Sequence, residues 1–426
     1  MRKLTAIIIL SICIVFNIFP AVKAQVKPPP ASADSVVLMD ATTGTILYEK
    51  NKDSAYPPAS TTKIMTILLV LEKTNLDDIV TVSKNASLAD GSKIYIREGE
   101  KLPVKELLYG LTLASANDCA VALAEHISGS VEEFAKLMNE RAKSLGAKNT
   151  NFVNPNGLYD VNHKTSAYDL ALIMQELTKY EIYKEIATTP SYIMAATNKC
   201  DQERPLWNGN RLVQPGDPQY YEDCIGGKTG YTIQSKHSYI AVASRNGQKL
   251  IVSLVHDSVK TFFKDSRALL DYGFDNFELS EYFEKGDVVS NKTLKDGTVI
   301  PLLASNDLYV VKDKNSTLPE VIKVEDPNLD VLSISKGDLI SNATITFNND
   351  SYSLDLASGI DYAKKKSSLS KLFLKDTTKN SSILMNLMKY ALIILVVFII
   401  FMRVKNTKRK RRRKLERFMD NFNNKK

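Results

Sequence analysis

The sequence PPASTTKIMTILLVLEK, at residues 57–73, indicates how the first part of the chain folds. Its two prolines favour the start of a helix, because their fixed backbone angle suits the first helical turn. The residues that follow Lys63 are apolar on nearly every side of such a helix. A helix of this kind must be surrounded by protein. We therefore expect a helix over residues 60–73 that is buried in the middle of a domain.

Strand patterns lie on both sides of this helix in the sequence. Ser35–Asp40 and Thr45–Lys50 lie around a turn that ends in glycine, and residues 237–244 and 249–256 flank an Arg-Asn-Gly-Gln turn. Both arrangements predict hairpins. Helical patterns recur at residues 103–115, 117–128, 131–145, 166–178 and 259–272. The expected fold class is α/β (α+β): an antiparallel sheet assembled from both ends of the domain and flanked by helices, with an inserted helical subdomain.

The sequence changes character after about residue 280. Short β-rich runs alternate with turns such as Lys295-Asp-Gly, which predicts a separate, small all-β domain. The expected organisation is a signal peptide at 1–24, a linker at 25–34, a first domain at 35–280, a β-rich domain at 281–362, a linker at 363–382, one transmembrane helix at 383–402 and a basic tail at 403–426.

Both ends of the chain have features of targeting segments. Residues 1–24 have a basic start, an apolar run and Val-Lys-Ala before Gln25, which is typical of a cleaved signal peptide. An uncleaved membrane anchor is the alternative. Residues 383–402 are long enough to cross a bilayer core of about 30 Å as a helix. An interfacial helix is the alternative, but residues 391–402 are apolar on every face, which favours a membrane span.

The net charge of +8 is unevenly distributed. Residues 1–24 carry +3 and residues 403–426 carry +10, whereas the rest has 41 basic and 46 acidic groups, a net charge of −5. A basic segment directly after a membrane span is expected on the cytoplasmic side. We therefore expect a single-pass protein of the cell membrane with its body outside the cytoplasm, and no nucleic-acid partner.

Ser60-Thr-Thr-Lys63 is the first of three short motifs that can carry chemistry. A serine hydroxyl is a poor nucleophile unless a base takes its proton. Lys63 lies one helical turn after Ser60 on the same face, and burial can lower the pKa of a lysine amine enough for it to act as that base. The N-terminus of the helix also offers backbone N–H groups to a developing oxyanion. By itself, however, the motif also fits an ordinary helix cap.

Ser115-Ala-Asn117 and Lys228-Thr-Gly230 are the second and third motifs. A hydroxyl and an amide two residues apart, at a break between helices, can face one cleft; alternatively, Asn117 caps the next helix. Gly230 would let a ligand approach a strand backbone closely, and Lys228 and Thr229 would hold a carboxylate. The alternative for the third motif is a glycine-rich turn with a surface lysine.

The ordered set S-x-x-K, S-x-N, K-T-G is the motif set of class A β-lactamases and penicillin-binding proteins. The surrounding sequence resembles the serine-type D-alanyl-D-alanine carboxypeptidases of low molecular mass, strongly over residues 33–275 and only in general texture over 280–362. The stretches that carry the resemblance are PPASTTKIMT, LASANDCAVALAEHISGS, FAKLMNERAKSLGAKNTNFVNPNGL and GGKTGYT. The resemblance implies a β-lactamase/transpeptidase-like catalytic domain followed by a β-rich domain and a membrane anchor.

The resemblance also implies a role for each motif. Ser60 would be the acylated nucleophile, Lys63 its general base and Ser115 a proton relay to the leaving D-alanine. The substrate would be bound by Asn117, Lys228, Thr229 and the backbone N–H of Tyr231. The implied partners are peptidoglycan stem peptides ending in D-Ala-D-Ala and β-lactams as covalent inhibitors, and no cofactor or metal is implied.

Other activities of the same fold are alternatives. A class A β-lactamase needs a glutamate that deacylates the enzyme, and the stretch AKNTNFVNPNGL, at residues 147–158, contains none. A DD-endopeptidase that cleaves cross-links would use the same chemistry on a different leaving group. A non-catalytic wall-binding protein would not need Ser60, Lys63 and the other motif residues.

The histidines and cysteines indicate no further site. Four widely spaced histidines and no Cys-x-x-Cys pattern argue against zinc. A Ser-His-Asp triad has no local signature here, although folding could bring a distant histidine to Ser60. We expect Cys119 to be a small buried side chain. For Cys200 and Cys224, a disulfide and two free thiols are both compatible with the sequence.

Overall fold

The computed structural model describes residues 26–314, 320–326, 333–347, 350–363 and 368–423. The signal peptide expected at residues 1–24 lies outside this part of the chain. The chain divides into two compact units, Met1–Pro327 with Leu339–Gly359, and Asn328–Asp338 with Ile360–Lys426.

A five-stranded antiparallel sheet is the centre of the first unit. Its order is β2-β1-β9-β8-β7, so two strands from before the helical insertion pair with three from after it. This confirms the prediction of a sheet assembled from both ends of the domain. Asn246 and Gly247 both have positive φ in the β8–β9 turn, as a two-residue hairpin requires. The strands are β1 (Ser35–Asp40), β2 (Ile46–Lys50), β7 (Cys224–Thr232), β8 (Lys236–Arg245) and β9 (Gln248–Asp257).

Most of the helices lie between β2 and β7 in the sequence. The longer ones agree with the predicted patterns to within a few residues, whereas the short α3 and α8 and the small hairpins β3–β4 and β5–β6 were not predicted. The helices are η1 (Ala59–Thr62), α2 (Lys63–Lys73), α3 (Lys84–Ser87), α4 (Val104–Leu113), α5 (Asn117–Ser128), α6 (Val131–Ser144), α7 (Ala167–Leu177), α8 (Glu181–Thr188), η2 (Arg211–Val213) and α9 (Phe262–Asn276). The small hairpins are formed by β3 (Ile79–Thr81) with β4 (Lys101–Pro103) and by β5 (Ser191–Met194) with β6 (Arg204–Trp207).

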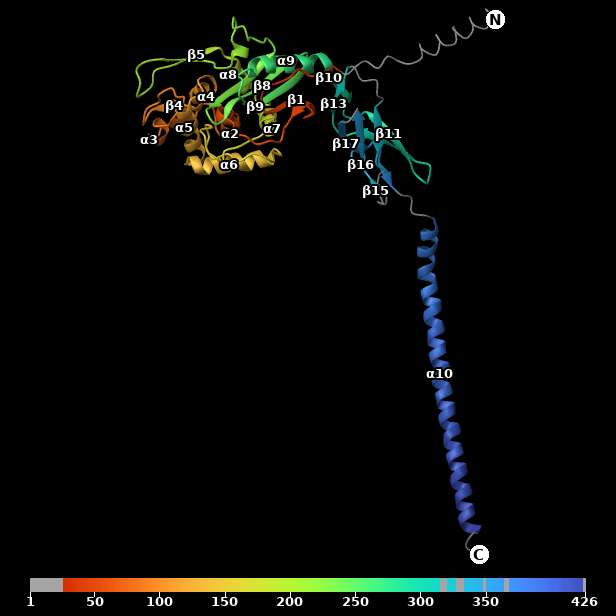
Figure 1. Ribbon diagram of the computed structural model, residues 1–426. Coiled ribbons are helices and arrows are strands. Elements are labelled where there is room, and N and C mark those ends of the chain that lie inside the picture. The colour runs from red at the N-terminus through yellow and green to blue at the C-terminus, as the bar shows by residue number, and fades with distance from the viewer. Residues whose placement is uncertain (1–25, 315–319, 327–332, 348–349, 364–367, 424–426) are drawn as a thin grey trace, which may run out of the picture. The chain divides into compact units, whose positions relative to one another are not determined.

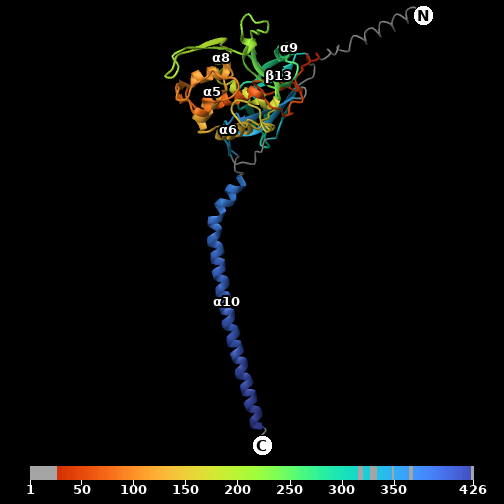
Figure 2. The same ribbon diagram turned by 60° about the vertical axis from the view of Figure 1, so that its left-hand side comes forward.

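The central sheet separates two apolar cores, because successive side chains of a strand point to opposite faces. Val37 and Met39 of β1 belong to the core that includes α2 and α7, and Val36 and Leu38 belong to the core that includes α9. Figures 1 and 2 show α9 on one side of the sheet and α6 on the other. The first eight residues of α2 are all buried, which confirms the predicted central helix.

The segment before β1 differs from the expected linker at 25–34. Ala31 and Ala33 are buried in the core that includes α9. The Ser32 hydroxyl donates to Asp257 at 2.8 Å, and the Ser32 backbone N–H donates to Asp265 at 3.0 Å. The chain is therefore packed from Ala31 onward, since these small side chains fit between the sheet and α9.

A second β region follows α9, as predicted. Its main sheet has the order β11-β12-β17-β16-β14, and β10 pairs with β13 beside it. The bounds are β10 (Phe277–Phe283), β11 (Val288–Thr293), β12 (Val299–Ala304), β13 (Leu308–Asp313), β14 (Val321–Val324), β16 (Leu339–Phe347) and β17 (Asp350–Ser358).

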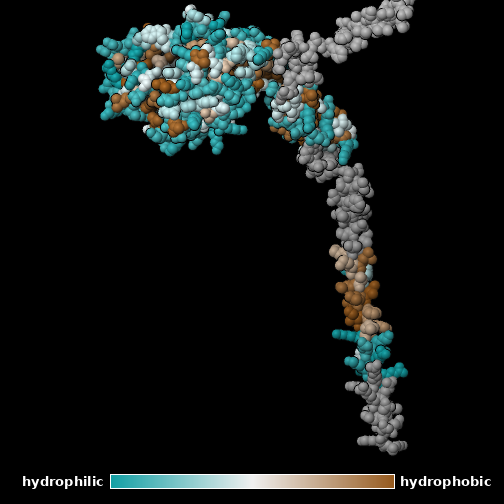
Figure 3. Space-filling model, viewed as in Figure 1, coloured by the Kyte–Doolittle hydropathy of each residue, from teal (hydrophilic) through white to brown (hydrophobic). Residues whose placement is uncertain are grey.

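The second unit contains the short pair β15 (Ser333–Ile334) and β18 (Tyr362–Ala363), and one long helix, α10 (Ser368–Asn423). The linker expected at 363–382 is therefore helical from Ser368 onward. The physical reason is that no glycine or proline occurs between Lys364 and Asn423 to end a helix. Within α10, Met385–Arg412 is long and apolar enough to cross a membrane, and Figure 3 shows its apolar band followed by hydrophilic side chains.

Candidate active site

Ser60 lies in a tight turn that leads into α2. This turn is a 3-10 helix, η1, so Ser60 precedes the α-helix that we expected to contain it. Lys63 is the first residue of α2, and its Nζ lies 2.8 Å from Ser60 Oγ. The predicted pairing of the two side chains is therefore present, because three residues are also one turn of a 3-10 helix.

Lys63 Nζ has two further partners. It donates to Asn117 Oδ1 at 2.7 Å and to the Asn156 carbonyl at 2.6 Å. Both of these oxygens can only accept hydrogen bonds. A neutral amine has two N–H groups and one lone pair, so with both N–H groups directed at these acceptors its lone pair is left for the proton of Ser60.

The environment of Lys63 favours that neutral form. Its side chain is completely buried. Burial lowers the pKa of Lys63 well below its ordinary value, and the positive charge of Lys228 lowers it further. The amine is therefore more readily neutral than an exposed lysine, as a base for Ser60 must be.

Asn117 joins the second motif to the first. It is the first residue of α5, and its side chain does not cap that helix. Instead, Oδ1 accepts from Lys63, while Nδ2 donates to the Asp90 carbonyl at 2.6 Å. The capping alternative for Asn117 is therefore wrong, and these two bonds define which way the amide points.

Ser115 lies at the junction of α4 and α5, two residues before Asn117. Its φ is +57°, a conformation that costs energy for a residue other than glycine. The side chain is half-buried. Ser115 therefore lies in a strained turn, two residues before the asparagine that contacts Lys63.

The third motif lies on β7, the edge strand of the sheet. A Cβ added at Gly230 would be 2.8 Å from Ser60 N and 2.9 Å from Pro58 O. Because only glycine leaves this space free, β7 packs directly against the turn that carries Ser60. We expected a ligand to approach the strand at Gly230, but the group that lies close to it is the backbone of the turn that carries Ser60.

Lys228 is almost completely buried on the same strand, and its Nζ donates to the Thr229 carbonyl at 2.9 Å. Burial lowers the pKa of Lys228 to about 7. The alternative of a surface lysine is therefore wrong. Thr229 is half-buried, and its Oγ1 lies near Gly209. The three motifs thus come together from the η1–α2, α4–α5 and β7 segments.

The Asn154-Pro-Asn-Gly-Leu158 loop completes the surroundings of Lys63, a role that we did not predict. Besides the contact of Asn156 with Lys63, the Pro155 carbonyl accepts from Thr66 at 2.6 Å. A Cβ at Gly157 would be only 1.9 Å from the Ala59 carbonyl oxygen. The family resemblance covered this stretch, but the sequence could not indicate which of its carbonyls faces Lys63.

No histidine forms a triad with Ser60 in the described chain. The nearest case is His163, which bonds to Thr62 and Val153. Cys119 is buried, as expected. Cys200 and Cys224 are free thiols, so the disulfide alternative is not observed.

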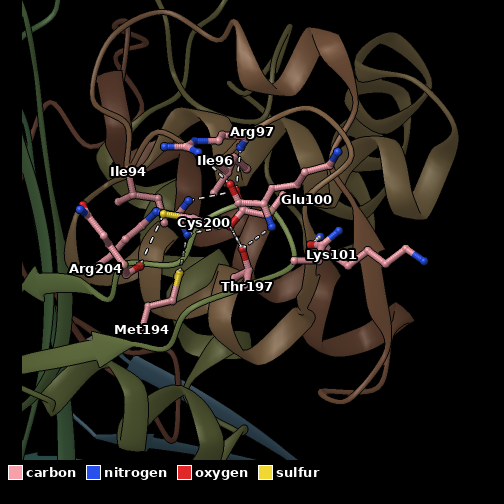
Figure 4. A network of polar contacts seen from close by, with 12 residues as sticks. Ile94, Ile96, Arg97, Glu100, Lys101, Met194, Thr197, Cys200 and Arg204 are labelled. Carbon is pink, nitrogen blue, oxygen red and sulfur yellow. Dashed lines mark hydrogen bonds and ion pairs between the residues drawn. The ribbon is translucent and has the colours of Figure 1, made fainter.

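Two polar clusters hold the segment before β4 in place. Asp118 accepts the backbone N–H groups of Ile94 and Ile96, at 3.1–3.3 Å. In the second cluster, shown in Figure 4, the buried carboxylate of Glu100 accepts two bonds from Arg204, at 2.7 and 3.0 Å, and one from Thr197 at 2.7 Å. These contacts fasten the segment to the β5–β6 hairpin.

The surroundings of each cluster shift the pKa of its acidic side chain. Burial raises the pKa of Asp118. Burial also acts to raise that of Glu100, but the bonds from Arg204 and Thr197 keep the pKa of Glu100 below its ordinary value. Glu100 therefore stays charged and paired, and the segment that supplies the Asp90 carbonyl to Asn117 is held at both of these points.

Two family profiles match the chain. The family described as D-alanyl-D-alanine carboxypeptidase matches residues 22–258, and the family described as penicillin-binding protein 5, C-terminal domain, matches residues 277–359. These matches cover the regions of the central sheet and of the second β region.

Individual proteins give the same result. D-alanyl-D-alanine carboxypeptidase DacF of Bacillus subtilis is 38% identical over 300 residues, which cover 68% of this chain and 75% of the relative. DacA of Haemophilus influenzae is 31% identical over 364 residues, which cover 80% of this chain and 88% of the relative. The solved structure of penicillin binding protein 5 from Haemophilus influenzae is similar with a TM-score of 0.69 and 31% identity, covering 80% of this chain and all of the other. The chain therefore belongs to the D-alanyl-D-alanine carboxypeptidase family of serine-type peptidases.

Proposed function

We propose that this protein is a membrane-anchored serine DD-carboxypeptidase that removes the terminal D-alanine from peptidoglycan stem peptides. One observation carries the proposal: Lys63 Nζ lies 2.8 Å from Ser60 Oγ, and its other two partners are obligate acceptors. The names of the relatives supply the substrate class.

The geometry supports a two-step acyl transfer. Neutral Lys63 takes the Ser60 proton while Oγ forms a bond to the carbonyl carbon of the penultimate D-alanine. The C=O electron pair moves onto oxygen, where the N–H groups of Ser60 and Tyr231 stabilise the negative charge. When the C–N bond breaks, Ser115 relays a proton to the departing amine. Water then attacks the ester carbon while Lys63 takes one of its protons. The bond from that carbon to Ser60 Oγ breaks, and Lys63 passes the proton to Oγ, which releases the shortened peptide as a carboxylic acid and restores the enzyme.

The third motif selects the substrate's end. Charged Lys228 and the Thr229 hydroxyl bind the terminal carboxylate of the peptide. Asn117 has a double role, since it orients Lys63 and hydrogen-bonds the substrate backbone. The substrate would lie along β7, whose outer edge has no neighbouring strand in the central sheet.

A β-lactam would acylate Ser60 by the same first step and leave slowly. Deacylation in class A β-lactamases relies on a glutamate, whereas the residues that contact Lys63 and Ser60 are Asn117 and Asn156. We therefore expect labelled penicillin to form a stable adduct with the protein. Rapid turnover without a trapped adduct would instead support the β-lactamase alternative.

The proposed location is the cell membrane, with α10 as a single span, the catalytic region outside and the basic residues after Met402 in the cytoplasm. Protease added to intact spheroplasts should remove the catalytic region and spare a tag at the C-terminus. Cleavage of the tag instead would reverse the proposed orientation.

The decisive assay measures D-alanine released by the detergent-solubilised full chain from a pentapeptide ending in D-Ala-D-Ala. Ser60→Ala should reduce release to background, and Ser144→Ala, at an exposed serine, should have no effect. Equal release by Ser60→Ala and wild type would contradict the assignment of the nucleophile. Running the assay on a cross-linked dimer as well distinguishes carboxypeptidase from endopeptidase action.

A further inference from the structure

His163 is a buried histidine that the proposed chemistry does not use. Only 1% of its surface is exposed. One ring nitrogen, Nε2, lies 2.8 Å from Thr62 Oγ1, and the other, Nδ1, accepts the backbone N–H of Val153 at 3.0 Å. Since Nδ1 accepts a hydrogen bond, the ring proton is on Nε2, which therefore donates to Thr62.

These two bonds connect the two segments that surround Lys63. Thr62 immediately precedes Lys63 in the turn that carries the nucleophile. Val153 immediately precedes the Asn154–Leu158 loop, whose Asn156 carbonyl accepts from Lys63. The ring of His163 also packs edge-on against Phe152, at 5.6 Å between ring centroids. The imidazole is thus a bridge of fixed length between the nucleophile's turn and the loop.

The bridge reinforces contacts at other points of the same loop. The Thr66 hydroxyl donates to the Pro155 carbonyl, and Gly157 packs against the Ala59 carbonyl. Neither of these contacts has a titratable group, and neither reaches the start of the loop. Of these three contacts, only that of His163 joins Thr62, the residue next to Lys63, to Val153, the residue just before the loop.

We propose that His163 is a positioning residue, which acts in its neutral, Nε2-protonated form to hold the Asn156 carbonyl on Lys63 and thereby directs the lysine's lone pair at Ser60. A displaced carbonyl would leave one N–H of Lys63 without an acceptor, and the amine could then rotate away from Ser60 Oγ. Misplacement of a catalytic group by about 1 Å can reduce a rate about 100-fold.

The surroundings keep the imidazole neutral. Burial lowers the pKa of His163 to about 4; Asp160 opposes this effect, and Lys63 adds to it when it is protonated. Protonation of the ring would place a proton on Nδ1, facing the Val153 N–H. It would therefore break the hydrogen bond between Val153 and His163.

The inference rests on the proposed function, and its test uses the detergent-solubilised full chain with labelled penicillin. His163→Phe keeps an aromatic ring but removes both bonds. We expect its acylation rate, and kcat for the peptide, to fall about 10- to 100-fold, with KM changed much less. His163→Gln, which has one donor and one acceptor, should recover part of the rate.

Asn139→Ala is the matched control. The Asn139 amide bonds to both the N–H and the carbonyl of Phe152, at the same end of the loop but without reaching Lys63's neighbours. This variant should lower Tm and leave the acylation rate unchanged. Equal rates in His163→Phe and wild type, or equal losses in His163→Phe and Asn139→Ala at matched Tm, would overturn the proposal.

A measurement on the wild type keeps the test decisive if His163→Phe does not fold. Nitrogen-15 labelling of the histidines reports by NMR which ring nitrogen carries the proton. A proton on Nδ1 of His163, or a charged ring at neutral pH, would overturn the proposal. Failure of the wild type to form any adduct would instead contradict the proposed function.

Discussion

At the scale of single residues, two buried lysines dominate the site. Lys63 and Lys228 are each at most 3% exposed, and burial lowers the pKa of both. Burying an amine without a carboxylate partner costs stability, so these two lysines do not stabilise the fold through their charge. The charge of Lys228 also lowers the pKa of Lys63.

The activity should therefore depend on pH through both lysines. On the acid side, kcat/KM rises with pH as Lys63 becomes neutral and can accept the Ser60 proton. On the alkaline side, it falls as Lys228, with a pKa of about 7 in the free enzyme, loses the charge that attracts the substrate's carboxylate. Rates of D-alanine release from about pH 5 to about pH 10 should give a bell-shaped profile.

Lys228→Arg distinguishes the two limbs. Arginine stays protonated at all these pH values, so the fall on the alkaline side should move to higher pH, whatever the absolute rate of the variant. The acid limb should stay close to that of wild type. An alkaline limb at the same pH in both proteins would show that another group causes it.

At the scale of elements, backbone contacts between distant segments position the chemistry. Gly157 in the loop packs on the Ala59 carbonyl, and Gly230 on β7 packs on the backbone of Ser60. Both glycines contact the same turn, η1, from segments far away in the sequence. At both contacts there is no room for a side chain between the glycine and the turn. Within the turn, Ala59 has a φ of +51°.

Gly157→Ala should therefore affect both stability and rate. The added Cβ would overlap the Ala59 carbonyl oxygen, and the φ of +83° disfavours alanine as well. The loop must move, which takes the Asn156 carbonyl away from Lys63. We expect a loss of clearly more than about 2 kcal/mol in the free energy of unfolding, measured by denaturant titration, together with much slower acylation by penicillin.

Gly129→Ala is the control for backbone strain alone. Gly129 ends α5 with a φ of +77°, and nothing lies within 4 Å of an added Cβ. This variant should lose only about 1–2 kcal/mol and acylate at the wild-type rate. Comparable behaviour of the two alanine variants would contradict the role of the close contact at Gly157.

At the scale of the whole molecule, the chain joins a catalytic region to a β region and a long helix. The three motifs lie before residue 258, within the match to the D-alanyl-D-alanine carboxypeptidase family. The match to the C-terminal domain of penicillin-binding protein 5 covers residues 277–359 and contains none of them. We therefore propose that the β region spaces the active site from the membrane.

Deletion of residues 283–362, with α10 retained, tests this spacer role. The deletion leaves every motif in place, so release of D-alanine from a soluble pentapeptide should stay within about twofold of wild type. Release from intact cell wall, measured on whole cells, should fall strongly. Equal losses on both substrates would instead show that the catalytic region needs the β region for its own folding.

Local pattern was sufficient for a large part of this protein. The strands of the central sheet, the longer helices and the Ser60–Lys63 pairing follow from periodicity, turn residues and one helical turn of spacing, and these act over a few neighbouring residues. The helical start of α10 was missed because composition suggested a linker, whereas the absence of glycine and proline permitted a helix.

Tertiary contacts decided the rest of the site. Asn117 and Asn156 meet Lys63 across 54 and 93 residues of sequence, and no local pattern encodes that meeting. Asparagine is a preferred N-cap residue of helices. In this protein, tertiary packing directs the side chain of Asn117 toward Lys63 instead. The same holds for His163, whose bonds to Thr62 and Val153 depend on a loop that packs against the turn carrying Ser60. Such contacts depend on long-range packing. The position of a loop is stabilised by the residues that it packs against, and these are distant from it in the sequence.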